Sequence, residues 1–159
     1  MIQKVAFKTL GCKVNQYESE SLKQAFMQNN FQVTEFKEKA DIYIINTCAV
    51  TSEAERKSRQ MIRKVFRMNP FATIIVTGCG VQSNLYDIKK CIDNGYIISN
   101  YYKEKIFSII QDTKFKTSTE EKTVYFQPAN LINKYNETPF PGAGTRIRGF
   151  VKIQDGCNQ

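Results

Sequence analysis

Apolar, strand-like runs and amphipathic, helix-like segments alternate over the first 112 residues of the chain. Residues 41–46 (DIYIIN) form a nearly continuous apolar run, which is typical of a strand buried on both faces. Residues 15–29 instead carry Leu22, Ala25 and Phe26 at helical spacing. We expect strands at residues 3–9, 31–36, 41–46, 73–77 and 96–99, and helices at residues 15–29, 51–68, 82–92 and 102–111.

This alternation, with short connections that fit right-handed crossovers, predicts a three-layer α/β domain over residues 1–112. Its mostly parallel sheet would be flanked by helices, as in Rossmann- and flavodoxin-like folds. Residues 113–145 are rich in Thr, Lys, Glu and Asn and hold three of the four prolines, which predicts an extended linker. Residues 146–159 resume a strand-like alternation. Because a lone strand is not stable by itself, we interpret them as the start of a further domain.

The helix expected at residues 51–68 has clear start and stop signals. Thr51 or Ser52 can cap its first turn, and Glu55 lies in a capping-box position relative to Ser52. Asn69, which precedes a proline, is expected to end it.

One side of this helix carries a stripe of arginines with no carboxylate between them. At about 100° per residue, the stripe consists of Arg56, Arg59, Arg63 and Arg67, flanked by lysines. Guanidinium groups match the geometry of phosphates, so the stripe could face RNA. It could equally be the solvated face that every amphipathic helix needs. The net charge of +8 favours an acidic partner such as nucleic acid.

Composition limits both the compartment and the chemistry. No stretch reaches the ~18–20 apolar residues of a membrane span, and the start lacks the apolar core of a signal peptide, so we expect a cytoplasmic protein without a membrane partner. In a reducing compartment the five cysteines are expected to be free thiols, catalytic groups or metal ligands. The absence of histidine excludes imidazole bases and histidine metal sites, so any metal would be held mainly by thiolates.

Three cysteines share one local setting. Cys12, Cys48 and Cys79 each follow an apolar run, in VAFKTLGC, IYIINTC and IIVTGC. In an open α/β sheet such positions gather at the carboxyl edge, where ligands bind. They could hold a metal or iron–sulfur centre, or they could be small buried residues. Zinc would need a fourth ligand, and we interpret its only candidate in this domain, Cys91, as structural. Three ligands would instead leave an iron with an open coordination position, which favours a reactive site.

Four motifs together resemble a known family. They are TLGCKVNQYES around Cys12, INTCAVTSEAERKSRQMIRK around Cys48, TGCGVQ around Cys79 and RGFVKIQDGCNQ around Cys157. In this order they are similar to the radical S-adenosylmethionine methylthiotransferases, and they cover essentially the whole chain. The form GCKVNQYE most resembles the branch that acts on tRNA carrying N6-threonylcarbamoyladenosine at position 37.

The resemblance implies a site and a reaction. Cys12, Cys48 and Cys79 would hold an auxiliary [4Fe–4S] cluster whose open iron carries the sulfur to be transferred. Cys157 would be the first ligand of a second [4Fe–4S] cluster, in a C-x3-C-x2-C motif, that binds and reductively cleaves S-adenosylmethionine. The resulting radical would abstract hydrogen from C2 of the adenine, where a methylthio group is installed.

The chain departs from the family pattern in two places. Gly80 stands where the family more often has a bulkier residue, which leaves the ligand intact. The next cysteine of the radical motif would fall two residues beyond Gln159, so we expect one part of a longer enzyme, inactive alone, whose radical-SAM barrel begins at residues 146–159. The alternatives are a methylthiotransferase for isopentenyladenosine or a ribosomal protein, and a non-catalytic metal- or RNA-binding module.

Overall fold

Six parallel strands form a single sheet in the computed structural model, which describes residues 2–112 and 122–131. The strands are β1 (Lys4–Thr9), β2 (Gln32–Thr34), β3 (Ile42–Thr47), β4 (Thr73–Gly78), β5 (Gly95–Ile98) and β6 (Lys122–Tyr125). Their spatial order is β2-β1-β3-β4-β5-β6, and every neighbouring pair runs parallel. The predicted α/β class is therefore confirmed.

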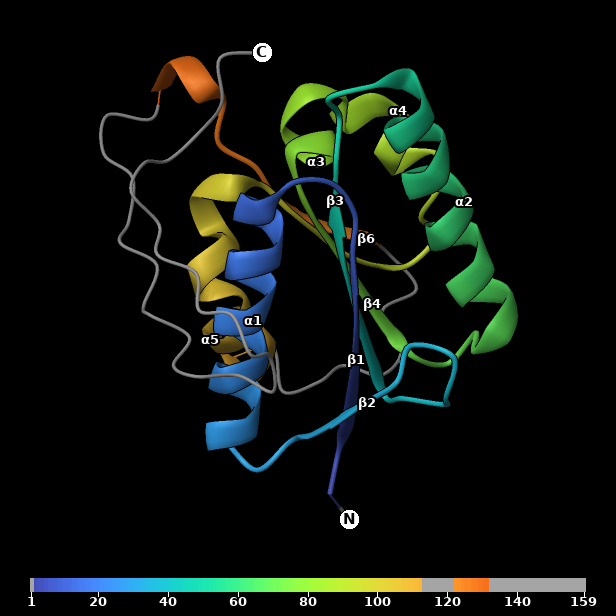
Figure 1. Ribbon diagram of the computed structural model, residues 1–159, viewed down its shortest axis with the longest axis vertical. Helices are drawn as coiled ribbons and strands as arrows, with labels where there is room; N and C mark the ends of the chain where they lie inside the picture. The colour runs from blue at the N-terminus through green and yellow to red at the C-terminus, as the bar shows by residue number, and fades with distance from the viewer. Residues whose placement is uncertain (1, 113–121, 132–159) are drawn as a thin grey trace.

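Helices cover both faces of this sheet, which confirms the predicted three layers (Figure 1). One face carries α1 (Lys13–Gln28) and α5 (Ile106–Asp112), and a 3₁₀ helix, η1 (Asn100–Lys105), leads directly into α5. The other face carries α2 (Ser52–Met68), α3 (Cys79–Ser83) and α4 (Leu85–Lys89). A short 3₁₀ helix, η2 (Ala129–Leu131), follows β6.

Strand β3 lies at the centre of two apolar cores. All of its residues are buried, as expected for a strand covered on both faces. Successive side chains of a strand point to opposite faces. Tyr43 and Ile45 accordingly pack in the core beneath α2, whereas Ile42 and Ile44 pack in the core beneath α1 and α5.

Helix α2 begins and ends close to the predicted positions. The Thr51 side chain accepts a hydrogen bond from the Ala54 amide at 3.1 Å, so Thr51 rather than Ser52 caps the helix. Asn69 ends it, and its amide donates to the Val65 carbonyl at 2.9 Å. The buried face of α2 consists of Ser58, Ile62 and Val65.

Two expected helices differ from the observed ones. The single helix expected at residues 82–92 is replaced by α3 and α4, because Asn84 leaves the helical conformation at the end of α3 and caps α4 by accepting from the Asp87 amide at 3.2 Å. The helix expected at residues 102–111 has the 3₁₀ geometry of η1 over its first part and becomes α-helical only at Ile106.

A sixth strand lies inside the segment that composition predicted to be a linker. Strand β6 pairs in parallel with β5, and Gln127 beyond it donates from its amide to Ser99 Oγ at 3.2 Å. An edge strand needs hydrogen bonds on one side only, so four residues within a polar segment suffice to form it. The rest of the expected linker and the expected start of the next domain, residues 146–159, lie outside the described residues.

Among the described residues, no helix combines the length and the apolar character that crossing a bilayer requires.

Candidate metal centre

The three candidate ligands follow three neighbouring strands of the sheet. Cys12 comes after β1 and precedes α1, Cys48 directly follows β3, and Cys79 follows β4 as the first residue of α3. Because β1, β3 and β4 are adjacent and parallel, their carboxyl ends meet at one edge, which lies uppermost in Figure 1. The predicted placement of these cysteines at a shared sheet edge is confirmed.

Glycines let the loops at this edge approach one another closely. Gly11 has a φ of +97°, and a Cβ atom there would lie 2.6 Å from the Cβ and Sγ atoms of Cys48. A Cβ atom on Gly80 would lie 2.8 Å from Thr47 Oγ1. Glycine is therefore required at position 11, where the loop after β1 passes Cys48, and at position 80 a side chain would crowd Thr47 where α3 begins beside the end of β3.

The three thiols differ in their environments. Cys12 is exposed, Cys48 is only 4% exposed, and Cys79 is half-buried. Burial raises the pKa of the Cys79 thiol; the Lys103 ammonium group and a hydrogen bond from Asn100 oppose this rise, while the Glu18 carboxylate and Cys12 add to it. The Asn100 side-chain amide donates to Cys79 Sγ at 3.9 Å.

A fully formed ligand group is not found in the part of the chain that the structure describes: no three acidic or cysteine side chains there are arranged to hold a metal ion. The donor chemistry nevertheless fits an iron–sulfur group, since three thiols follow adjacent strand ends and Gly11 lets the loop before Cys12 approach Cys48 closely. The side chains would have to turn toward one another to bind it.

A buried polar network supports the edge from below, and sequence reasoning missed it. Asn15, 1% exposed, donates from Nδ2 to the Leu10 carbonyl at 2.8 Å and to the Thr47 carbonyl at 3.0 Å. Asn46 donates from Nδ2 to the Asn15 carbonyl at 3.0 Å. Asn15 thereby ties the loop before Cys12 to the residue before Cys48. The sequence signal for this network was Asn46, a polar residue at the end of the apolar run of residues 42–45.

Unused polar atoms also gather at this edge. Within the described residues, four buried side-chain oxygens have no hydrogen-bond partner, and they belong to Asn46, Thr77, Gln82 and Asn100. These residues lie at the ends of β3 and β4, in α3, and directly after β5. Because buried polar groups are normally paired, their concentration beside the cysteines indicates that the edge accommodates a polar group or water.

The arginine stripe on α2 is partly neutralised by carboxylates of the first helical turn. Glu53 accepts two hydrogen bonds from Arg56, at 2.7 and 2.8 Å, and Glu55 lies 3.9 Å from Arg59. The Arg56 hydrogen bond is the main cause that lowers the pKa of Glu53 to about 2, and Glu53 raises the pKa of Arg56 in turn.

The second half of the stripe remains available. Arg63 is exposed and has no carboxylate partner among the described residues, and the same holds for Arg67, which donates only to the Arg63 carbonyl at 3.4 Å. The sequence interpretation did not anticipate that Glu53 and Glu55, outside the stripe, reach back to its first two members.

The fourth described cysteine, Cys91, does not belong to this edge. Cys91 is 6% exposed and packs in the core beneath α2 with Ile88 and Ile92, as its structural interpretation predicted. Cys157 lies outside the described residues, so its predicted role as a ligand stays a prediction.

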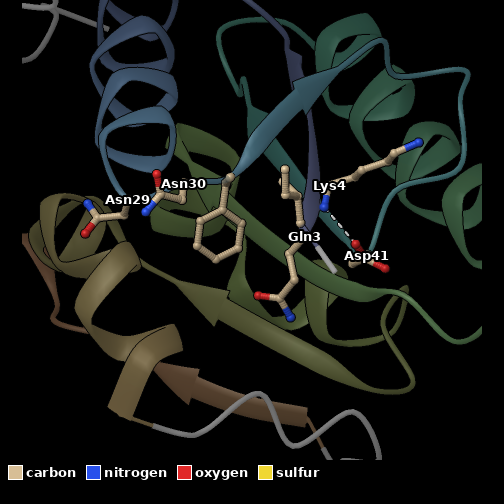
Figure 2. Close-up of a pocket in the computed structure, with 7 residues that line it drawn as sticks. Gln3, Lys4, Asn29, Asn30 and Asp41 are labelled. Atoms are coloured by element: carbon tan, nitrogen blue, oxygen red, sulfur yellow. Dashed lines mark hydrogen bonds between the residues drawn. The ribbon is translucent and has the colours of Figure 1, made fainter.

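An open hollow lies at the opposite end of the sheet (Figure 2). It has a volume of about 690 Å³ and is lined in part by Gln3, Asn29 and Asn30, with Asp41 accepting a hydrogen bond from the Lys4 amide at 2.7 Å. None of the residues predicted from the sequence lies in it. The hollow and the cysteine edge are therefore separate features.

Comparisons with known proteins place these observations among relatives. The model of a family described as "Uncharacterized protein family UPF0004" matches residues 4–99. A protein of Aquifex aeolicus named "Threonylcarbamoyladenosine tRNA methylthiotransferase MtaB" is 36% identical over 98% of this chain, and one of Bacillus subtilis with the same name is 37% identical over 97%. A "tRNA-2-methylthio-N(6)-dimethylallyladenosine synthase" of Pelagibacter ubique is 28% identical. The chain spans 37%, 34% and 36% of the lengths of these relatives.

Proposed function

Because the chain belongs to the uncharacterized protein family UPF0004, and relatives 36% and 37% identical to it are named tRNA methylthiotransferases, we propose that it is the N-terminal, iron–sulfur-binding part of such an enzyme. The comparisons confirm the predicted family resemblance. The observation that carries the assignment to this part is the placement of Cys12, Cys48 and Cys79 on adjacent strand ends.

In this proposal the three thiolates hold an auxiliary [4Fe–4S] cluster, which supplies the sulfur atom for transfer when it is bound. The protein contributes the shape and the rigidity of the site. Gly11 lets the loop before Cys12 approach Cys48 closely, and Asn15 fixes the backbone before Cys12 and before Cys48. Such pre-organisation limits the other conformations that the backbone around the three cysteines could adopt before the cluster binds.

The substrate of the longer protein is proposed from its relatives. The proteins of Aquifex aeolicus and Bacillus subtilis carry threonylcarbamoyladenosine in their names, and the dimethylallyladenosine synthase is less similar at 28% identity. We therefore assign the adenosine at position 37 of tRNA bearing a threonylcarbamoyl group, modified at C2. Cys157 would begin the second cluster, which acts with S-adenosylmethionine.

Iron and sulfide analysis of this chain after anaerobic reconstitution tests the proposal. The unmodified chain is expected to bind about four irons, as a single [4Fe–4S] cluster requires. Cys12→Ala, Cys48→Ala and Cys79→Ala should each lose most of this iron. Cys91→Ala is the control, because that side chain belongs to the apolar core. Zinc in place of iron, or iron loss in Cys91→Ala alone, would contradict the assignment of ligands.

Binding of RNA by α2 forms a second, separable part of the proposal. Arg63→Glu or Arg67→Glu is expected to weaken binding of a tRNA anticodon stem-loop several-fold at low salt, because each exposed guanidinium lacks a carboxylate partner among the described residues. The slope of log affinity against log salt should fall by about 0.7–0.9 for each phosphate that the variant no longer neutralises. Filter binding over a salt series measures both.

Lys105→Glu is the matched control, since it makes the same change of charge at the end of η1, next to α5 on the opposite face of the sheet. An equal loss of affinity in this control would mean that only the net charge matters, and the assignment of α2 as the RNA-facing helix would be abandoned.

A further inference from the structure

A buried ion pair lies beneath the cysteine edge. Lys103 Nζ donates to Glu18 Oε2 at 2.6 Å, and the two residues are 4% and 9% exposed. The pair connects η1 to α1 across 85 positions of the chain. Removing two charges from water costs several kcal/mol for each ion, so an ion pair at such a site calls for an explanation.

Stability alone does not explain this pair. Replacing a buried ion pair by apolar residues of similar volume is often neutral or stabilising. Helix α1 is also held to α5, the continuation of η1, by aromatic packing, since Phe26 of α1 contacts Phe107 of α5 edge to face with ring centroids 5.2 Å apart. Leu22, Phe26, Ile106 and Ile110 belong to one buried cluster between the same elements. An apolar pair would extend that cluster at lower cost.

The location of the pair relates it to Cys79. Lys103 lies on η1, which starts at Asn100, two residues after the end of β5, and β5 is the neighbour of β4, the strand directly before Cys79. Asn100 itself donates to Cys79 Sγ at 3.9 Å. The ammonium group belongs to η1, which packs against β4 and α3, the elements on either side of Cys79, whereas the Glu18 carboxylate belongs to α1, which packs against β1, β2 and β3. The positive end of the pair therefore dominates at this side of the cysteine edge.

We propose that Lys103, held in place by Glu18, is a positioning residue that supplies a fixed positive charge beside Cys79 and raises the reduction potential of the iron–sulfur group bound there. The inference rests on the proposed function, because it needs that group to bind. Three thiolate ligands make the site negative, and one-electron reduction adds a further negative charge. A nearby ammonium stabilises the reduced form more than the oxidised form.

Variants with opposite charge changes test this inference in the reconstituted chain. Glu18→Gln leaves the ammonium group unopposed and should shift the midpoint potential upward. The double variant Glu18→Gln/Lys103→Met removes both charges and should shift it downward relative to the unmodified chain. Potentials are measured by anaerobic titration with dithionite, and melting temperature and iron content are recorded for every sample.

A matched control uses a second ion pair of α1. Lys23 and Glu20 lie 2.8 Å apart and are about a quarter exposed, so Glu20→Gln/Lys23→Met makes the same charge changes at the surface and should leave the potential unchanged. Lys103→Arg, which keeps the charge, should also stay close to the unmodified value.

The outcomes separate this inference from the proposed function. If the unmodified chain binds no iron, the proposed function fails and the inference fails with it. If all chains bind equal iron and the potentials of the two test variants coincide with that of the unmodified chain, the pair is structural only and the inference is overturned while the proposed function stands. Iron loss from a double variant that still melts cooperatively supports the inference, because the positive charge of Lys103 is then needed to offset the negative charge of the bound iron–sulfur group.

Discussion

Replacing Gly78 with alanine is expected to lower the free energy of unfolding by about 3–5 kcal/mol, from the combined costs of backbone strain and overpacking. Gly78 ends β4 with a φ of +101°, which side chains rarely adopt. An added Cβ atom would lie 2.3 Å from the Thr47 carbonyl oxygen and 2.6 Å from the Thr47 amide nitrogen. These are backbone atoms of the central strand β3, so they cannot move aside. Urea denaturation followed by circular dichroism measures the loss.

Gly80→Ala is the comparison for this prediction. Its Cβ atom would meet a side chain, Thr47 Oγ1, at 2.8 Å. No positive φ is involved at this position, so we expect a smaller loss of about 1–2 kcal/mol from overpacking alone. Equal stability of the Gly78→Ala variant and the unmodified chain would show that β3 and β4 do not approach as closely as the structure has them.

Removing one partner of the Lys103–Glu18 pair is expected to cost about 3–5 kcal/mol of unfolding free energy, because it leaves a charge buried without compensation. Lys103→Met leaves the Glu18 carboxylate buried without its partner, with only 9% of the residue exposed. The double variant Glu18→Gln/Lys103→Met should recover most of the loss. Denaturation of the two single variants and the double variant, in the absence of iron, gives the coupling energy of the pair.

The surface pair of the same helix provides the reference. Lys23→Met removes the partner of Glu20 where both side chains are about a quarter exposed, and we expect a change of less than about 1 kcal/mol. A loss in the double variant as large as that in Lys103→Met would mean that the side chains act through their shape, and that no uncompensated charge causes the destabilisation.

Much of the fold and of the site followed from local patterns. The runs at residues 41–46 and 73–77 have uninterrupted apolar centres, IYII and IIV, and the structure shows both as buried parallel strands. The three strand-end cysteines were identified from the same patterns, because a parallel sheet brings the ends of its strands to one edge. The cap at Thr51 required only a hydroxyl before an amphipathic segment.

Other features escaped prediction because their cause lies far away in the chain. Strand β6 exists because β5 offers an open edge, and the polar composition around residues 122–125 gave no sign of it. Nothing in the sequence around Glu18 distinguishes it from a solvent-facing carboxylate on a helix, and only its partner on η1 makes it part of a buried ion pair.

The sequence by itself determined most of the elements, the parallel sheet and the edge at which the cysteines meet, because periodicity and strand polarity are local properties of the backbone. The tertiary structure alone decided which groups surround that edge: the Asn15 bridge between two loops, the close approach at Gly78, and the ammonium group of Lys103 near Cys79. These depend on distances between residues remote in the chain, and such distances are set only when the helices pack onto the sheet.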